Sequence, residues 1–387
     1  MCSQALSPRR VSGPMLRCDV LIVGGGPAGS TCARDLMRSG LDVVVIDKAR
    51  FPRDKVCAGW ITPAVVETLG LDLADYARRH TLQAFHGFRT CAIGHREVRT
   101  DYAATISYGI RRCEFDHYLL ERSGAGVRSA EPVIRLEPGG GRWIVNGQIQ
   151  AAVLVGAGGH FCPVARMLNP DGDEGPVVAA QEVEVCLSEA QQAECRIDGE
   201  MPALYFCPDR KGYGWCVRKG DFLNVGFGRL NGHGQRFPAQ ARAFQEFLDS
   251  AGAVPRDLPR PWKGHAYRLY ARPQRRLMGD GVVLVGDAAG LAYPVSGEGI
   301  LTAVESGRLA ARAIVEAAGQ YSRDRLAAYA ALLEARYGRP ALVRQEPWRL
   351  PPGLVSWIGV RLMSTGWFAR HVLLDRWFLH AGQPALT

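Results

Sequence analysis

The hydrophobic pattern is clearest near the start of the chain. An apolar run at residues 18–23 is followed by a glycine-rich turn at 24–29. A helical pattern then covers residues 27–39, and a second apolar run covers 41–46. Runs that are apolar at nearly every position are typical of strands buried on both faces of a parallel sheet. Gly40 stands where the helix should end, and Asp47 directly follows the second run. The pattern predicts a compact β-α-β unit.

Strand and helix patterns alternate along the rest of the chain, with no internal repeat. Apolar alternation favours strands within residues 81–108, the segments 177–187 and 203–227 are also typical of strands, and residues 281–285 form another buried-strand pattern. Helical spacing favours helices at 63–69, 114–123, 237–251 and 299–318. Residues 127–137 and 143–155 flank the Gly139–Gly141 turn, and the pattern predicts a hairpin or paired strands there. From residue 321 onward the pattern is mostly helical and is interrupted by prolines at 340, 347, 351 and 352.

Composition narrows the class of protein. With 387 residues, 47% hydrophobic and 22% charged, the chain can form one large domain or two modest ones and is neither disordered nor fibrous. Its 11 cysteines form no Cys-x-x-Cys pair and have no His partner at zinc spacing, which argues against a disulfide framework and a structural metal. The sequence carries no signal-peptide pattern and no apolar run long enough to span a bilayer, so we expect a cytoplasmic protein.

The chain is basic, with 47 Lys and Arg against 38 Asp and Glu and a net charge of +9. Only five of the basic residues are lysine, so the excess mainly reflects an arginine-rich composition. The basic residues are not grouped with stacking aromatics as a single-stranded nucleic acid would require. We therefore expect a small organic substrate and no nucleic-acid partner, and the pattern indicates no particular oligomeric state.

The glycine-rich turn has the spacing of a dinucleotide site. Gly24 permits a tight turn, Gly26 lets the backbone approach a pyrophosphate, and Gly29 lets the helix pack closely on the strand. Pro27 and Ala28 begin the helix, whose N-terminus faces the phosphates in such sites.

An acidic residue completes this motif. Asp47 stands at the end of the second strand, 18 positions after Gly29, where it can accept hydrogen bonds from an adenosine ribose, and Lys48 follows it. Strand, turn, helix and acid together predict a bound FAD or NAD.

A second glycine-rich segment favours FAD. The strand at 281–285 leads into Gly286 and Asp287, then Pro294, and then a turn at the start of a helix formed by Gly297, Glu298, Gly299 and Ile300. In these residues the sequence resembles the flavoprotein superfamily that has the fold of para-hydroxybenzoate hydroxylase. The resemblance implies that Asp287 binds a ribityl hydroxyl and that residues 297–300 cradle the isoalloxazine. A helix N-terminus there would stabilise the negative charge of a reduced flavin.

Within this superfamily the sequence is similar to the geranylgeranyl reductase-like oxidoreductases. The loop after the second strand carries Arg53, Lys55, Cys57 and Ala58, like the family loop that places a cysteine near the flavin. Arg112 begins a helix motif whose arginine reaches the FAD in the family. The resemblance implies that these five residues also bind FAD.

Three residues are candidates for contact with the reacting atoms. Cys57 either lines the flavin cavity or is a small buried thiol. Tyr213 and Trp215, in a segment similar to the family's substrate-domain strands, either wall an apolar substrate pocket or fill the sheet core. No Ser-His-Asp order or carboxylate pair is evident, as expected where the cofactor carries the chemistry.

The sequence departs from its relatives at two places. A segment that usually reads Gly-Ala-Asp-Gly in the superfamily is Gly156–Gly159 without the Asp, which weakens the case for NAD(P)H, although NAD(P)H remains a candidate electron donor. The Phe-Pro pair that follows Trp215 in the reductases is Val217-Arg218 here, and the missing Pro and first Trp of the halogenase motif argue against halogenation.

Three functions therefore stay open. Reduction of an unsaturated bond in an apolar or aromatic substrate has the nearer motif match. Hydroxylation of an aromatic substrate by a flavin monooxygenase has the broader support of the fold. A non-redox protein that binds a prenylated partner is the distant alternative, against which the intact FAD motifs argue.

The predicted fold is α/β (mixed α+β), a Rossmann-like FAD-binding domain with an inserted β-sheet substrate domain and a helical C-terminal tail. The predicted bounds are 17–80, 105–170 and 275–320 for the FAD-binding domain, 81–104 and 171–274 for the substrate domain, and 321–387 for the tail.

The tail is rich in Trp and Phe, and six arginines from Arg339 onward stand against Glu346 and Asp375. It is either a helical cap on the substrate domain or a site of peripheral contact with an anionic membrane.

Overall fold

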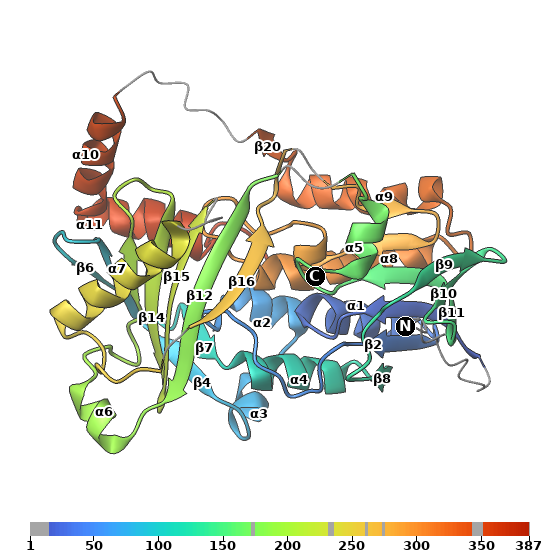
Figure 1. The fold of residues 1–387 in the computed structure, drawn as a ribbon, viewed down its shortest axis with the longest axis horizontal. Helices are drawn as coiled ribbons and strands as arrows, with labels where there is room; N and C mark the ends of the chain where they lie inside the picture. The colour runs from blue at the N-terminus through green and yellow to red at the C-terminus, as the bar shows by residue number, and fades with distance from the viewer. Residues whose placement is uncertain are drawn as a thin grey trace, which may run out of the picture.

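Two large sheets lie at opposite ends of the long axis of the molecule (Figure 1). The computed structural model describes residues 15–171, 175–230, 236–259, 262–272, 275–342 and 351–386. Strands of the second sheet come from residues 87–101 and 177–268, between segments of the first sheet, so the chain passes between the two sheets repeatedly. The predicted α/β fold with an inserted β-rich part is confirmed.

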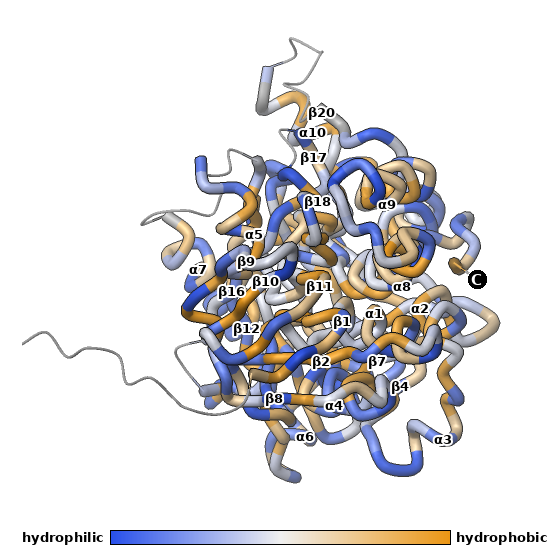
Figure 2. The backbone as a smooth tube through the Cα atoms, turned by 90° about the vertical axis from the view of Figure 1, so that its right-hand side faces the viewer, coloured by the Kyte–Doolittle hydropathy of each residue, from blue (hydrophilic) through white to orange (hydrophobic). Residues whose placement is uncertain are grey.

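The first sheet is built around parallel strands with the order β18-β19-β11-β1-β2-β8. Every residue of β2 is buried, and Figure 2 shows hydrophobic segments of β1, β2 and β11 near the centre of the view. Because β1, β2 and β19 are parallel, the turns after them meet at one edge of the sheet. The bounds are β1 (Leu16–Val23), β2 (Val43–Ile46), β8 (Gly126–Arg128), β9 (Leu136–Gly139), β10 (Arg142–Val145), β11 (Ile149–Gly156), β18 (Met278–Gly279) and β19 (Val282–Leu284).

Helices α1 (Pro27–Arg38) and α8 (Ile300–Glu316) pack tightly against each other beside this sheet. A Cβ at Gly307 would lie 2.4 Å from the Ala28 carbonyl oxygen, so this glycine permits the close approach of the two helices. The bounds of the neighbouring elements are α2 (Pro63–Leu69), α3 (Leu73–Ala77), α4 (Arg112–Arg122), α5 (Pro163–Leu168), the short 3₁₀ helix η1 (Gly286–Ala288) and α9 (Arg323–Tyr337).

The second sheet has the order β16-β12-β15-β14-β13-β5-β6, and different elements pack on its two faces. Helix α7 (Arg236–Ala251) packs on one face, where the Phe227 and Phe244 rings stack at 5.5 Å between centroids. The other face carries Trp215 and Val217. The bounds are β5 (Gly87–Ala92), β6 (Val98–Asp101), β12 (Val177–Cys186), α6 (Glu189–Glu194), β13 (Ala203–Phe206), β14 (Gly212–Lys219), β15 (Phe222–Leu230) and β16 (Lys263–Arg268).

The C-terminal tail caps that other face. Leu373, Leu374 and Phe378 are buried in one cluster with Phe88 and Trp215 of the second sheet. The predicted helical tail is thus confirmed. Its elements are α10 (Pro352–Met363), α11 (Gly366–Phe368) and the π-helix η2 (Ala369–Phe378), and the short strands β17 (Ala271–Arg272) and β20 (Ala341–Leu342) pair with each other.

The predicted hairpin at the Gly139–Gly141 turn is confirmed as the antiparallel pair β9–β10, which is shorter than the predicted ranges 127–137 and 143–155. Strands β9 and β10 do turn at Gly140 and Gly141, but β8 pairs with β2, and residues 129–135 contain no strand. Strand β10 then turns again at Asn146 and Gly147 to pair with β11. A glycine-rich turn signals a reversal of the chain, but it does not tell a local partner from a distant one.

A third, small sheet has the order β3-β7-β4. Strand β4 (Leu82–Phe85), which the sequence analysis assigns to the substrate domain, pairs here with β7 (Ser107–Ile110), and β3 (Trp60–Ile61) pairs with β7 as well. The domain bounds stay a prediction, and the predicted helix break at Pro347 lies outside the described residues.

Candidate active site

A cavity of about 640 Å³ lies where the carboxyl edge of the first sheet faces the second sheet. Its walls come from the turn after β1, the end of β2, the loop 53–58, the start of α4, strands β14 and β16, and the turn before α8. Predicted residues that line it are Gly24, Gly26, Pro27, Ala28, Asp47, Lys48, Arg53, Lys55, Cys57, Ala58, Arg112, Tyr213, Trp215, Asp287, Gly297, Glu298, Gly299 and Ile300. Segments far apart in the chain therefore meet in one cavity.

The first glycine turn has the geometry that a dinucleotide requires. Gly24 has φ +115°, and a Cβ there would lie 2.4 Å from the Ala157 carbonyl oxygen. A Cβ at Gly29 would lie 1.9 Å from the Gly24 carbonyl oxygen, so Gly29 lets α1 begin directly against the turn although it does not line the cavity itself. The first turn of α1 then presents its free backbone N–H groups at the cavity.

Asp47 supports this turn from the end of β2. Its Oδ2 accepts a hydrogen bond from the Gly25 N–H and its Oδ1 accepts one from the Ala49 N–H, each at 2.8 Å. The side chain is buried, yet it lines the cavity beside the exposed Lys48. The carboxylate thus both fixes the turn and remains available to a ribose hydroxyl.

Asp287, which follows β19, belongs to a group of polar side chains that includes Lys55 and His265. Lys55 Nζ lies 2.5 Å from His265 Nε2, and His265 Nε2 lies 3.6 Å from Asp287 Oδ2. Burial lowers the pKa of this imidazole, against the opposing effect of its contact with Asp287. Burial alone would raise the pKa of Asp287, but the contact with His265 and the charges of Lys55 and Arg112 outweigh it and lower that pKa. Asp287 is therefore an ionised acceptor.

A second charged group holds the start of α4. Arg112 Nε and Nη2 donate to the two carboxylate oxygens of Asp116, both at 2.8 Å, and Arg53 Nη1 lies 3.1 Å from Asp116 Oδ2. Asp116 is fully buried and Arg112 nearly so. One carboxylate thereby fixes two guanidinium groups at the cavity wall, where they favour an anionic ligand.

The turn before α8 is also shaped by glycines. Gly297 has φ +71°, and a Cβ there would lie 2.3 Å from the Tyr267 hydroxyl. Gly286, in η1, has φ +58° and does not line the cavity, whereas Asp287 beside it does line it. Pro294 does not line this cavity but a second one, so its predicted role in binding the cofactor lacks a direct contact.

The candidate catalytic residues lie on one side of the cavity. The Tyr213 hydroxyl donates to the Ser296 carbonyl oxygen at 2.6 Å, and Trp215 Nε1 donates to Asn224 Oδ1 at 2.8 Å. Cys57 is partly buried. Tyr213 and Trp215 belong both to the hydrophobic cluster and to the cavity wall, so the two sequence interpretations of these rings are not exclusive.

A second cavity of about 610 Å³ adjoins the first. The two share Tyr213, Tyr267, Ser296, Gly297 and Phe378, so these residues form the partition between them. The walls of the second cavity are mostly apolar and include Val178, Leu230, Leu269, Val355, Ile358, Leu362, Met363, Leu373 and Trp377. Arg210, Lys211 and Arg229 also line it.

Sequence reasoning missed several residues of the first cavity. His265 and Tyr267 of β16, Phe378 of η2 and His160 after β11 all line it. None of them stands in a motif, because they come from the second sheet, the tail and a loop that only the folded chain brings together.

The groups that line the cavity fit the chemistry of FAD. A glycine turn too tight for a Cβ leads into a helix N-terminus, and Asp47 stands at the end of the neighbouring strand β2. The ionised carboxylate of Asp287 and several basic side chains also line the cavity. Residues 17–337 match the protein family described as FAD binding domain. The chain belongs to this family.

Two relatives of this flavoprotein are named as reductases. It is 31% identical over 349 residues to the menaquinone reductase of Mycobacterium tuberculosis, and the match covers 83% of this chain and 81% of that protein. It is 29% identical over 345 residues to the chloroplastic geranylgeranyl diphosphate reductase of Oryza sativa, over 82% of this chain and 70% of that protein. The flavoprotein is an FAD-dependent oxidoreductase, and the predicted resemblance to geranylgeranyl reductase-like enzymes is confirmed.

A solved structure shares the fold. A geranylgeranyl bacteriochlorophyll reductase-like protein from Thermoplasma acidophilum superposes with a TM-score of 0.70 at 22% identity, over 91% of this chain and 88% of that chain. At this identity the likeness concerns the fold alone.

Proposed function

We propose that this flavoprotein reduces an unsaturated bond in a long apolar substrate, such as a prenylated quinone or lipid. The observation that carries the proposal is the pair of adjoining cavities. The first has the motifs for FAD, and the second is an apolar chamber separated from it only by a partition of shared residues. An apolar chain in the second chamber would place its end, or its head group, beside the flavin site.

Bound FAD supplies a hydride for such a reduction, or activation of O₂ in the monooxygenase alternative. The chain's own residues bind, orient and exclude water. Asp47, Asp287 and the α1 N-terminus hold the cofactor, while Tyr213, Trp215 and Phe378 keep the reacting region apolar. Hydride addition also requires a proton, and Lys55, whose pKa burial lowers to about 8, is a protonated side chain on the same wall at neutral pH.

The product of the reaction tests this proposal. Holoprotein reduced by dithionite without O₂, or by NADH or NADPH as candidate donors, is mixed with menaquinone or geranylgeranyl diphosphate, and products are analysed by mass spectrometry. We expect a product that has gained hydrogen and no oxygen. A product that appears only in air and carries an oxygen atom from O₂ would instead support the monooxygenase alternative.

We also propose that the tail rests on an anionic membrane surface. Leu354, Trp357 and Leu362 on α10 are exposed by 42%, 58% and 43%, and Trp367 after it by 68%. The Arg361 guanidinium lies over the Trp357 ring at 5.4 Å. Ile358 and Leu362 of this helix also line the second cavity, so a lipid substrate would enter from the surface that the helix touches. Within the described residues no helix is long and apolar enough to span a bilayer, so the proposed contact is peripheral.

Vesicle binding tests this contact. The substitution Trp357→Ser should weaken binding to vesicles containing phosphatidylglycerol by about tenfold, because an interfacial Trp contributes more than 1 kcal/mol. Sedimentation with the vesicles measures the effect. Ile134→Ser, at an even more exposed apolar residue on the first-sheet side, is the control and should leave binding unchanged. Equal binding of both variants and the parent protein would contradict the membrane contact.

A further inference from the structure

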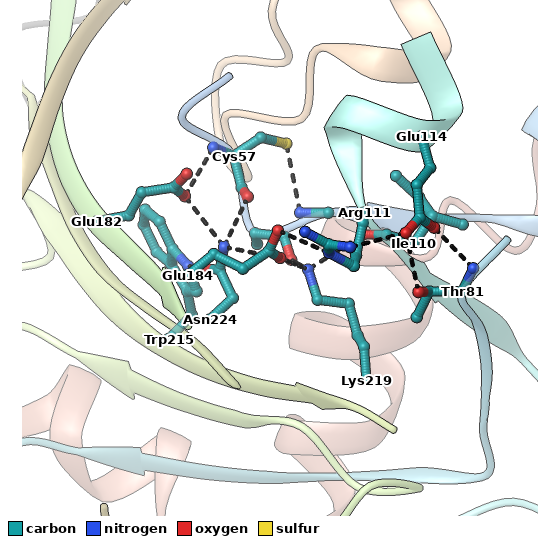
Figure 3. Close-up of polar contacts among 12 residues, drawn as sticks. Cys57, Thr81, Ile110, Arg111, Glu114, Glu182, Glu184, Trp215, Lys219 and Asn224 are labelled. Carbon is teal, nitrogen blue, oxygen red and sulfur yellow. Dashed lines mark hydrogen bonds and ion pairs between the residues drawn. The ribbon is translucent and has the colours of Figure 1, made fainter. Parts of the chain in front are cut away.

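Three buried polar side chains of the second sheet hold one short piece of the loop that lines the flavin cavity (Figure 3). Glu182 Oε2 accepts from the Cys57 N–H at 2.6 Å, and Asn224 Nδ2 donates to the Cys57 carbonyl oxygen at 3.1 Å. Lys219 Nζ donates to the Ala58 carbonyl oxygen at 3.1 Å. Backbone groups of two successive residues, both on the cavity wall, thus depend on side chains from three strands.

Burying these three polar side chains in the sheet costs free energy. Glu182 is 6% exposed, Asn224 1% and Lys219 0%, where a sheet face normally buries apolar groups. Residues alternate across a strand, so all three share the face that carries Trp215, while the opposite face packs on α7. The loop backbone requires polar partners once it is buried, and the sheet supplies them here.

Lys219 is built into the loop with little free space. A Cβ at Gly59 would lie 2.6 Å from Lys219 Nζ, and a Cβ at Gly109 would lie 2.7 Å from Lys219 Cγ. The ammonium also donates to the Ile110 carbonyl oxygen at 3.0 Å and pairs with Glu184. Two glycines therefore form the passage through which this side chain reaches the loop.

The cluster balances its charges. Burial raises the pKa of Glu182 to about 8, against the opposing effects of Lys219 and the Cys57 N–H. Lys219 pairs with Glu184, and Arg111 pairs with Glu184 and Glu114, so each cation of the cluster faces a carboxylate. A balanced cluster can hold the loop without an uncompensated buried charge.

Asn224 also links the loop to the substrate side of the cavity. Its Oδ1 accepts from Trp215 Nε1, and the indole lies on Gly226, where a Cβ would be 2.2 Å from the ring. An indole N–H can only donate and a backbone carbonyl can only accept, so the two contacts fix the orientation of the amide. Only a side chain with both an acceptor and a donor can connect Trp215 to Cys57 in this way.

We propose that Glu182, Asn224 and Lys219 are positioning residues that hold the Cys57–Ala58 backbone beside the flavin site. The hydrogen-bonded chain Trp215–Asn224–Cys57 then couples the ring that meets the substrate to the loop that meets the cofactor. This inference rests on the proposed function for the identity of the ligands but not for its test. The reactivity of the Cys57 thiol reports the loop position in protein without FAD or substrate.

The experiment measures site-resolved alkylation. The full chain is treated with iodoacetamide, and the rate at Cys57 is followed by peptide mass spectrometry with the exposed Cys186 as internal reference. Trp215→Phe keeps an aromatic ring but removes the N–H donor, and Asn224→Leu removes both contacts. We expect each variant to raise the rate ratio of Cys57 to Cys186 by about fivefold, as expected for loss of a buried hydrogen bond that closes a local structure.

The double variant separates coupling from simple shielding. If Trp215 acts through Asn224, Trp215→Phe adds little in the Asn224→Leu background, whereas loss of shielding by the indole would multiply the two effects. Thr90→Val, a buried polar change on β5 of the same sheet, is the matched control and should leave the ratio unchanged. A ratio within twofold of the parent in Trp215→Phe, or multiplicative effects in the double variant, would overturn the proposal. The conservative Trp215→Phe variant decides the matter if Asn224→Leu does not fold.

Discussion

Replacing Asp287 by alanine should remove most of the bound flavin. The carboxylate is ionised, lines the cavity and lies in η1 shortly after β19, where a ribityl hydroxyl can donate to it. A hydrogen bond to a charged group is worth about 1.5–3 kcal/mol, so the dissociation constant for FAD should rise by about 10- to 100-fold. Absorbance of the purified protein and titration of the protein without FAD measure this change. Asp287→Asn keeps an acceptor oxygen but loses the charge, so its dissociation constant for FAD should lie between those of the parent protein and Asp287→Ala.

Two variants serve as controls for this prediction. Asp280→Ala changes an aspartate at the other end of the same strand, where Oδ1 accepts from the Arg323 N–H at 2.7 Å, outside the cavity. Cys57→Ala removes a thiol from the cavity wall and should weaken FAD far less than Asp287→Ala does. If Asp287→Ala retains as much flavin as these two variants, the assignment of the ribityl contact is wrong.

Much of the cofactor side of the site could be predicted from the sequence because each part is local. The turn after β1 needs its glycines within a few residues, and Gly24 and Gly29 have no room for a Cβ. Asp47 and Asp287 each follow a buried strand, and parallel strands bring their carboxyl ends to one edge. Local pattern and sheet geometry therefore agree in this half of the molecule.

The substrate side could not be predicted in the same way. His265 reaches the cavity from β16 and Phe378 from η2, and neither position is marked by a motif. Lys219 and Asn224 stand in a segment that resembles the substrate-domain strands, but their partners Cys57 and Ala58 are more than 150 residues away. Such contacts depend on sheet register and on the tail, which the pattern of apolar residues does not specify.

The second cavity also follows from tertiary packing alone. Its walls combine β12, β15, the turn before α8 and the tail, so its volume depends on how the tail lies on the sheet. The aromatic pattern of the tail allowed a cap or a membrane contact, and the buried Leu373 and exposed Trp357 show that different parts of the tail have different surroundings. A chamber under a partly exposed apolar helix is what gives the proposed lipid substrate its route.

Electron transfer to an apolar substrate is the central claim, and one measurement tests it most directly. Holoprotein reduced by dithionite is mixed without O₂ with a quinone that carries a long prenyl chain, and separately with the same ring lacking the chain, while flavin absorbance is followed. If the chain occupies the second cavity, the prenylated quinone should reoxidise the flavin at least about tenfold faster at equal concentration, because several buried CH₂ groups contribute about 0.8 kcal/mol each. Equal rates for the two quinones, or no reoxidation of the flavin by either quinone, would contradict the account.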